Sequence, residues 1–350
     1  MYKIETKVDQ NLNVGLDIGG SLGKIALFLP TNLIVADQQL KEYELNLVPE
    51  YKEAKLYIKI IKSLDVHNLI NFAKSNIPNS QSIRIYSTGG GSFKFAQEIN
   101  DSTTKVENKA IVSRIDEMNS LVSGLSFIYH KISNPFFKID ENGNMINFDY
   151  NDIFPIILVN VGSGISILRV DSFKEFKRVS GSLLGGGTLV GLANLLIGVN
   201  DYDKLMELAS KGDNSTLDFL AKDLSPLIQI NIVQPVVASS FGKASQNTQN
   251  ITMRMDKDLS NPKHYKAEDV ALSLIKMISY NTGHLGYLVG RVNKVKNILF
   301  AGNYVRNNMM IMKFITDSVR FCSKNEVWPF FCKYSGFLGC LGAVFSDKTE

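Results

Sequence analysis

The sequence predicts a two-lobed α/β protein in which a unit of strand, glycine turn and strand occurs twice. The chain has 350 residues, whereas single hydrophobic cores usually stop growing at roughly 250–300 residues. Apolar patterns typical of strands and of helices alternate along it. Residues 16–21 are echoed by residues 159–164, with an acid in the first copy where the second has an amide. Two lobes with a cleft between them are therefore expected.

The composition narrows the class of protein. Hydrophobic residues make up 45% and charged residues 21% of the chain, which is the globular average and excludes wholesale disorder. The net charge is +4, and Lys and Arg are interspersed with acids, so no nucleic-acid partner is expected. No apolar stretch is long enough for a membrane span, and residues 1–13 lack the apolar region of a secretory signal. We expect a cytoplasmic protein.

Cysteine and histidine give no metal or disulfide pattern. The three cysteines all lie in the last thirty positions, and the four histidines fall in four separate segments. An odd, late cluster of cysteines is not a disulfide framework, and widely spaced histidines lack the spacing of a zinc site. We interpret the cysteines as reduced thiols.

The first lobe is predicted to span residues 13–152, after an N-terminal extension of residues 1–12. Its strands and helices follow from apolar alternation and helical spacing. A turn at residues 140–144, with Asn-Gly at its centre, joins two short strands in a surface hairpin. The expected elements are strands at 14–18, 24–29, 55–61 and 82–86, and helices at 66–74, just after 91, and at 116–129.

The second lobe is predicted to span residues 153–350. It opens with a buried strand at 155–161, then a glycine turn, then a strand to residue 170. A glycine-rich run precedes the helix at 189–196, so glycines lie at a helix N-terminus. The remaining expected elements are a strand at 297–301 and helices at 202–211, 216–224, 267–292, 308–321 and 336–345.

Four glycine loops, each at a strand end or a helix start, indicate phosphate binding. Glycine lets a backbone approach a phosphate closely, and helix N-termini favour anions. None of the loops has the pattern of a P-loop or of a dinucleotide fingerprint. We therefore expect a nucleotide clamp between the lobes. In it, Asp17 would hold Mg²⁺ directly or through water, and Lys24 would neutralise phosphate charge.

Several runs together resemble the type II, eukaryotic-style pantothenate kinases. Their order and spacing match from about residue 13 to residue 345. The runs that carry the resemblance are residues 15–22, 88–95, 159–164, 178–187, 208–213, 238–242 and 300–303.

This resemblance implies an actin-like ATPase fold of the ribonuclease-H-like kind, with ATP and Mg²⁺ as cofactors. It implies transfer of the γ-phosphoryl group to the hydroxyl of pantothenate, the first step of coenzyme A biosynthesis, with coenzyme A thioesters as possible regulators. Ser163 and Arg178 match residues near the substrate and the transferred group, where an arginine stabilises phosphoryl charge. The residues that match nucleotide-binding positions are Asp17, Gly19, Gly20, Ser21, Lys24, Gly185, Gly186, Gly187, Gly302 and Asn303.

One position departs from the expected pattern. The family's catalytic glutamate is expected directly after the Gly-Gly-Gly-x-aromatic-Lys-Phe run, where this chain has Ala96. A methyl group cannot accept a proton, and Glu98 is a fallback base that a helix would turn about 200° away. Two functions stay open: a working pantothenate kinase, and a nucleotide-binding pseudokinase that regulates or scaffolds an active paralogue. Another actin-like sugar or acetate kinase is a weaker third.

The long helix expected at residues 267–292 predicts an oligomer. It carries more apolar residues than one narrow stripe would hold, so a second face is expected to need cover. We expect a homodimer, or a heteromer with a paralogue, through the second lobe.

Overall fold

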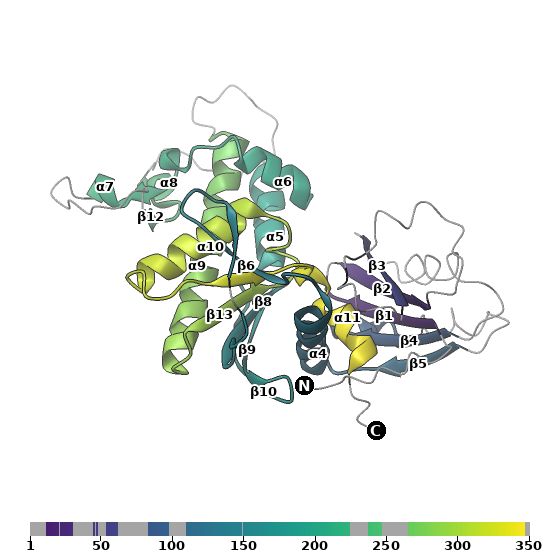
Figure 1. Cartoon of the computed structure of the whole chain (residues 1–350). Helices are drawn as coiled ribbons and strands as arrows, with labels where there is room; N and C mark the ends of the chain where they lie inside the picture. Colours follow the sequence, from purple (N-terminus) through teal and green to yellow (C-terminus); the bar gives the residue numbers. More distant parts are fainter. Residues whose placement is uncertain are drawn as a thin grey trace.

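The computed structural model describes residues 12–20, 22–30, 45, 47, 54–61, 83–97, 110–148, 150–224, 237–246 and 265–346. Two α/β lobes lie side by side, and helices α4 (Glu117–Lys131) and α11 (Leu338–Phe345) lie between them (Figure 1). The predicted two-lobed α/β architecture is therefore confirmed.

The first lobe is built on a five-stranded sheet with the order β3-β2-β1-β4-β5. β1 and β2 form the expected antiparallel hairpin, in which Asp17 lies opposite Lys24. β4 runs parallel to β1 on its other side and places Thr88 opposite Asp17. The strands are β1 (Leu12–Ile18), β2 (Gly23–Pro30), β3 (Ala54–Ile61), β4 (Ile83–Thr88) and β5 (Ala110–Arg114).

The second lobe is built on a seven-stranded sheet with the order β10-β9-β8-β13-β14-β6-β7. Its central strand β8 is almost wholly buried, as a continuous apolar run predicts. The strands are β6 (Phe136–Ile139), β7 (Met145–Asn147), β8 (Ile156–Val161), β9 (Ile165–Ser172), β10 (Glu175–Ser182), β13 (Asn297–Ala301) and β14 (Phe330–Cys332).

The two sheets share one topology. In each, a hairpin is extended by a third antiparallel strand on one side and by two parallel strands on the other. The order β10-β9-β8-β13-β14 therefore repeats β3-β2-β1-β4-β5. This is the duplicated ribonuclease-H-like unit of the actin-like fold, so the expected duplication is confirmed.

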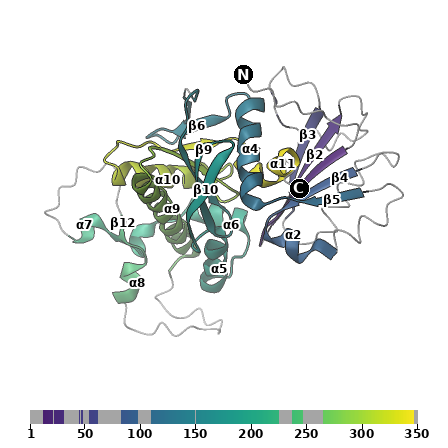
Figure 2. The same cartoon turned by 90° about the horizontal axis from the view of Figure 1, so that it is seen from below.

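α4 and α11 cross between the lobes in nearly direct backbone contact (Figure 2). A side chain on Gly342 would overlap the carbonyl oxygen of Ser120, and one on Gly124 would lie 2.7 Å from the carbonyl carbon of Leu338. Both positions must lack a side chain for the helices to approach this closely. The crossing fixes the N-terminus of α4 relative to the sheet of the first lobe.

The other helices belong to the second lobe, apart from α2 in the first. Of these, α9 and α10 pack on the second sheet, while α7 lies beside β11 (Phe219–Leu220) and β12 (Val237–Ser239). The 26-residue α9 occupies the range expected from the sequence, and it packs against α10, α5 and α6. The bounds are α2 (Gly90–Lys94), α5 (Gly186–Ile197), α6 (Tyr202–Ala209), α7 (Ala221–Leu224), α8 (Gly242–Gln246), α9 (Ala267–Val292) and α10 (Met309–Cys322).

The prediction of a single helix at residues 216–224 is wrong. This segment forms a short 3₁₀ turn η2 (Asn214–Thr216), then β11 (Phe219–Leu220), which pairs with β12 (Val237–Ser239), and then α7. Asp218 explains the break, because its buried carboxylate accepts hydrogen bonds from Asn214 Nδ2, the Phe241 N–H and Ser273 Oγ at 2.7–2.9 Å. Contacts distant in sequence override the local helical pattern here.

The lobe boundary expected at residues 152/153 does not separate the two sheets. The hairpin of β6 and β7 belongs to the second sheet, because Phe137 in β6 pairs with Phe331 in β14. In the other direction, α11 leaves the second lobe and packs on α4 and β1. The predicted helix at 66–74 and residues 1–11 of the predicted extension 1–12 lie outside the described residues, while Leu12 begins β1. Among the described helices, none is both long and apolar enough to cross a membrane.

Candidate active site

The first glycine hairpin carries a close ion pair. Asp17, at the end of β1, binds Lys24 of β2 with 2.8 Å between Oδ2 and Nζ, and the two side chains are about 15% and 14% exposed. Burial alone would lower the pKa of Lys24, but the Asp17 carboxylate outweighs it and the pKa is raised. A lysine that is charged at neutral pH therefore lies beside the carboxylate predicted to hold Mg²⁺.

Glycines from two other elements enclose the Asp17 carboxylate. A Cβ atom on Gly339 of α11 would lie 2.7 Å from Asp17 Oδ2. One on Gly89, whose φ is +83°, would lie 2.8 Å from Oδ1. Backbone thus packs where any side chain would displace the carboxylate, so its position is fixed from both sides.

The two echoing glycine turns face each other across the lobes. A Cβ atom on Gly20, in the first hairpin, would lie 3.6 Å from Ser163 Oγ in the turn between β8 and β9. The duplicated units therefore meet at their turns, as a clamp on phosphates requires. Gly19 lies in the same first turn, where its N–H donates to the Leu22 carbonyl at 3.0 Å. Ser21 lies outside the described residues.

The Gly185–Gly187 loop packs on the glycine turn at residues 162–164, and two of its N–H groups donate to that turn. The Gly186 N–H donates to the Gly162 carbonyl at 2.8 Å, and the Gly187 N–H donates to the Ser163 carbonyl at 3.0 Å. A Cβ atom on Gly185 would lie 2.6 Å from the Ser163 oxygen. The glycines serve first to let the start of α5 contact the turn of β8 and β9.

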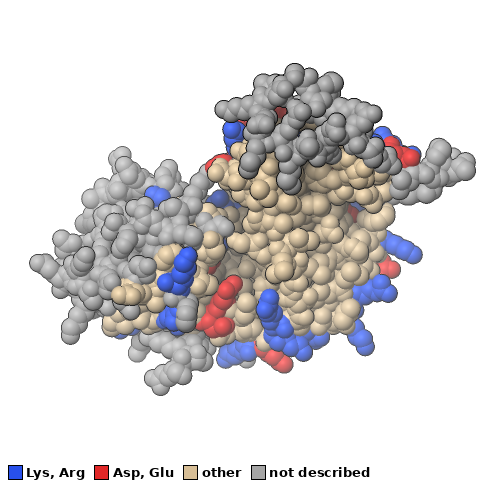
Figure 3. Space-filling model, turned by 180° about the vertical axis from the view of Figure 1, so that it is seen from behind, with Lys and Arg blue, Asp and Glu red and all other residues tan. Residues whose placement is uncertain are grey.

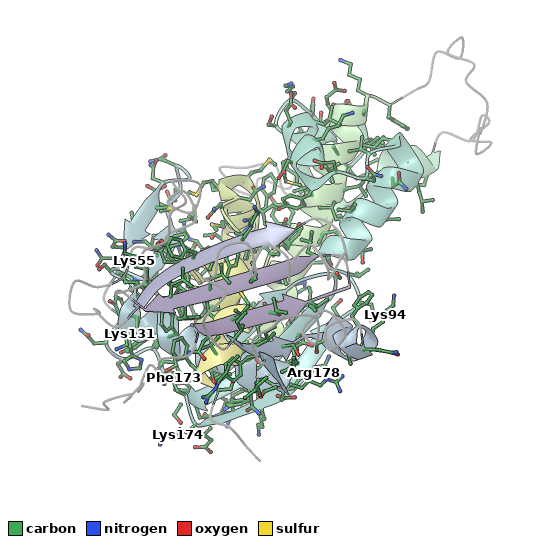
Figure 4. The ribbon with its side chains drawn as sticks, turned by 90° about the vertical axis from the view of Figure 1, so that its right-hand side faces the viewer. Lys55, Lys94, Lys131, Phe173, Lys174 and Arg178 are labelled. Carbon is green, nitrogen blue, oxygen red and sulfur yellow. The ribbon has the colours of Figure 1, made fainter. Side chains whose placement is uncertain are left out.

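Arg178 projects from β10, the edge strand of the second sheet. In Figure 4 it lies toward the side of Lys94 and α2, away from Phe173 and Lys174 at the start of β10. A Cβ atom on Gly181 would lie 2.9 Å from Arg178 Nη2. Arg178 is exposed and interacts electrostatically with Glu117. The guanidinium is thus available at the junction of the lobes.

Glu117 is a candidate that the sequence interpretation missed. It is the first residue of α4, directly after Asp116, whose carboxylate caps the helix by accepting the Asn119 N–H at 2.9 Å. Desolvation raises the pKa of Glu117, and Asp17 raises it further, while Lys24 and Arg178 oppose the shift. Glu117 therefore lies within electrostatic reach of three predicted site residues. A raised pKa is a property of carboxylates that accept protons in catalysis.

A signal for Glu117 was present in the sequence. The pair Asp116-Glu117 begins a helix, and the apolar residues 111 and 112 precede it within the strand β5. Ligands of open α/β sheets bind at the carboxyl ends of strands, so an acid at such a junction is a site candidate. The apolar face of this helix predicts its packing, whereas its acidic first turn marks the candidate site.

Ala96 has helical backbone just after the turn at Phe95 that ends α2, and no described contact joins it to this cluster. Glu98 lies outside the described residues. In contrast, the carboxylate of Glu117 is electrostatically coupled to that of Asp17, since Asp17 raises the pKa of Glu117.

Gly302 and Asn303 follow β13, next to the second glycine turn. Gly302 has a φ of +100°, and a side chain there would overlap Val161 of β8. Asn303 Oδ1 is buried and has no hydrogen-bond partner among the described residues. These residues thus lie beside residues 162–164, where the resemblance expects nucleotide contacts.

The acid set at the junction suits magnesium better than zinc. Among the described residues no group of three or more His, Cys, Asp or Glu side chains could enclose a metal. Mg²⁺ keeps several waters and binds through one or two carboxylates together with substrate phosphates. The part-buried carboxylate of Asp17 fits that mode, and its ion pair with Lys24 would have to loosen.

The duplicated sheets and facing glycine turns define an actin-like ATPase fold. The chain belongs to the Fumble family, which matches residues 13–346, so the expected type II pantothenate kinase family is confirmed. Pantothenate kinase 1 of Arabidopsis thaliana is 32% identical over 97% of this chain and 86% of its own length. Pantothenate kinase of Schizosaccharomyces pombe is 29% identical over 97% and 82%.

In other relatives the match to this chain covers less than half of the relative's length. Pantothenate kinase 2 of Oryza sativa is 39% identical over 77% of the chain, and the match spans 28% of that protein's length. Mouse 4'-phosphopantetheine phosphatase is 31% identical over 96% of the chain and 41% of its own length. Among solved structures, Bacillus thuringiensis ParM with ATP matches over 96% of this chain and 98% of its own, at 11% identity and a TM-score of 0.43. The fold assignment rests on strand order, since that TM-score is low.

Proposed function

We propose that this chain is a pantothenate kinase that transfers the γ-phosphoryl group of ATP, with Mg²⁺, to the hydroxyl of pantothenate. Family membership and the names of the relatives support a phosphotransferase that uses ATP. The observation that supports the proposal is the electrostatic coupling of Glu117 to Asp17, Lys24 and Arg178, of which Asp17 and Lys24 flank the first glycine turn. It supplies a base, a metal-binding carboxylate and two cations, the parts that phosphoryl transfer needs.

Each residue has a distinct proposed role. Glu117 accepts the proton of the pantothenate hydroxyl while the hydroxyl oxygen bonds to the γ-phosphorus of ATP. The bond from that phosphorus to the bridging oxygen breaks, and ADP leaves with the electron pair. Lys24 and Arg178 stabilise the charge that spreads over the phosphoryl oxygens. Asp17 would hold Mg²⁺, which when bound lowers the negative charge of the phosphates. Ser163, in the turn between β8 and β9 that faces the first glycine turn, would lie near the transferred group.

Assigning the base to Glu117 changes the meaning of Ala96. The pseudokinase alternative arose because position 96 lacks a carboxylate. A glutamate at the start of α4, with a raised pKa and two cations nearby, removes the need for an acid at position 96. Activity of the isolated chain is therefore expected, and the pseudokinase becomes an outcome of the test.

The experiment is a coupled assay of the purified chain with ATP, Mg²⁺ and pantothenate. Glu117→Gln should lower kcat by roughly 10²–10⁴-fold, the usual contribution of a general base, with nucleotide affinity nearly unchanged. Glu98→Gln is the matched control and should leave kcat unaltered. Loss of activity in Glu98→Gln alone would assign the base to Glu98. An inactive native chain that binds nucleotide, and that Ala96→Glu does not activate, would favour the pseudokinase.

We also propose that the protein self-associates through the second lobe, although α9 contributes less than the sequence suggested. Most apolar residues of α9 are buried within its own lobe, and Leu288 and Val292 are the large hydrophobic residues it exposes. The adjacent α5 contains no charged residue, yet Leu195 and Leu196 are 81% and 57% exposed. A helix without charge is normally covered. Figure 3 shows a second-lobe face with few charged side chains.

Light scattering tests the association. A dimer at micromolar concentration is expected, and Leu195→Asp should shift it to monomer, whereas the exposed Leu183→Asp outside the helix should not. A monomeric native chain would refute self-association, and a mixed complex with a co-expressed paralogue would identify a heteromer. Regulation by coenzyme A thioesters and the cytoplasmic location stay predictions of the sequence.

A further inference from the structure

Thr88, the last residue of β4, has a buried hydroxyl without a partner. Its side chain is fully buried, and Oγ1 has no hydrogen-bond partner among the described residues. Leaving a buried hydroxyl unpaired is unfavourable, whereas an apolar side chain of the same shape would avoid that penalty. A threonine is therefore a costly choice here unless another state of the protein uses its hydroxyl.

The strand register places Thr88 beside Asp17. The two residues are directly opposite each other on the parallel strands β1 and β4, so their side chains project from the same face of the sheet. The following residue, Gly89, turns the chain against Asp17 Oδ1. The unpaired hydroxyl thus lies on a strand that directly borders the buried carboxylate.

Asp17 depends on a partner that a ligand would draw away. Its ion pair is with Lys24, and its carboxylate is enclosed by Gly89 and Gly339, which carry no side chain. A phosphate group between the facing glycine turns would compete for the lysine. A part-buried carboxylate that loses its lysine is stabilised by another donor, with or without a bound metal ion, because an unpaired charge shielded from water is unfavourable.

We propose that Thr88 is a positioning residue, whose hydroxyl donates to the Asp17 carboxylate when Lys24 turns to an anionic ligand. Rotation about χ1 between staggered rotamers is the movement by which the hydroxyl of Thr88 would change partner. The exchange keeps Asp17 in place while Lys24 is used elsewhere. The identity of the anion as a nucleotide phosphate rests on the proposed function, but the coupling between Thr88 and Lys24 does not.

A double-mutant cycle tests the coupling without any ligand. In the native background, Thr88→Val should leave the folding equilibrium unchanged or shift it toward the folded state. In a Lys24→Met background, where Asp17 already lacks its cation, the same change should lower the folded-to-unfolded ratio about tenfold or more. Ser87→Ala is the matched control, because Ser87 has a buried unpaired hydroxyl on the opposite face. Equal effects of Thr88→Val in both backgrounds would overturn the proposal.

Titration with Mg²⁺ and ADP gives a second, independent measurement, which decides alone if Lys24→Met does not fold. Thr88→Val should weaken ADP binding about tenfold, Thr88→Ser should restore it, and Ser87→Ala should bind as the native chain does. Equal affinity in the native chain and Thr88→Val would count against the positioning role. A native chain that binds no ADP would refute the proposed function, and the mutant cycle would then decide the role of Thr88.

Discussion

Gly342→Ala is expected to disrupt both stability and catalysis, because it acts at the crossing of α4 and α11. A methyl group at this position would overlap the Ser120 carbonyl oxygen and lie 2.7 Å from its carbon. Carbon atoms in contact are normally about 3.5–4.0 Å apart, so the two helices must separate by at least about 1 Å, and by more to clear the oxygen. Neither neighbour is a flexible side chain, so the backbone of one helix has to move.

The expected magnitude follows from that displacement. Overpacking of a rigid core costs roughly 1–3 kcal/mol, and each kcal/mol lowers Tm by about 2–4 °C in domains of 150–250 residues. The start of α4 carries Glu117, and the start of α11 lies against Asp17. A displacement of about 1 Å between catalytic groups can lower the rate on the order of 100-fold. Activity should therefore fall more than stability alone accounts for.

The assay combines thermal unfolding with the coupled kinase assay at a temperature where the variant is fully folded. Gly191→Ala in α5 is the matched control, because a Cβ atom there meets nothing within 4 Å. That change should be neutral or stabilise by up to about 1 kcal/mol, as alanine favours a helix over glycine. If Gly342→Ala keeps native Tm and native kcat, the helices are not held by this contact and the reasoning fails.

Three further outcomes are expected. The pKa of Glu117 is raised, so above that pKa its negative charge destabilises the folded state. Glu117→Gln should therefore raise Tm at pH 7 while lowering kcat. A lower Tm at pH 7 would contradict this reasoning. The pKa of Lys24 is raised because its charged form is stabilised in the folded state, and this stabilisation is present below pH 10.5 and lost as the pH rises further. Lys24→Met should therefore be less stable than the native chain at pH 7, and the difference should shrink in strong alkali. Gly186→Glu should abolish binding of a nucleotide analogue in calorimetry, since its side chain would crowd Gly162 and repel phosphate; undiminished affinity would exclude the loop from the site.

The sequence alone predicted the duplicated strand hairpins, the long helix α9 and the protein family. The glycine turns and the echo between residues 16–21 and 159–164 predicted the duplicated hairpins, because strand patterning and turn chemistry are local properties. The long helix α9 was bounded correctly for the same reason, since its apolar spacing is sustained over many turns. The family resemblance was carried by those same local runs and is confirmed.

Contacts between distant segments were decided by the tertiary structure. The helix expected at residues 216–224 gave way because the Asp218 carboxylate binds groups from Phe241 and Ser273, which local propensity does not register. The β6–β7 hairpin joined the second sheet through pairing of Phe137 with Phe331, nearly two hundred residues away.

The candidate base shows the same division most clearly. Asp17 and Lys24 lie on one hairpin, so turn geometry alone made them neighbours and the sequence could name both. Glu117 meets them only because glycines let α11 pack against both α4 and β1, which brings the start of α4 to the end of β1. Its raised pKa arises from that burial and from the charge of Asp17. The sequence thus identified the candidate residues that share one local element, whereas the electrostatic coupling between residues of different elements depends on how those elements pack.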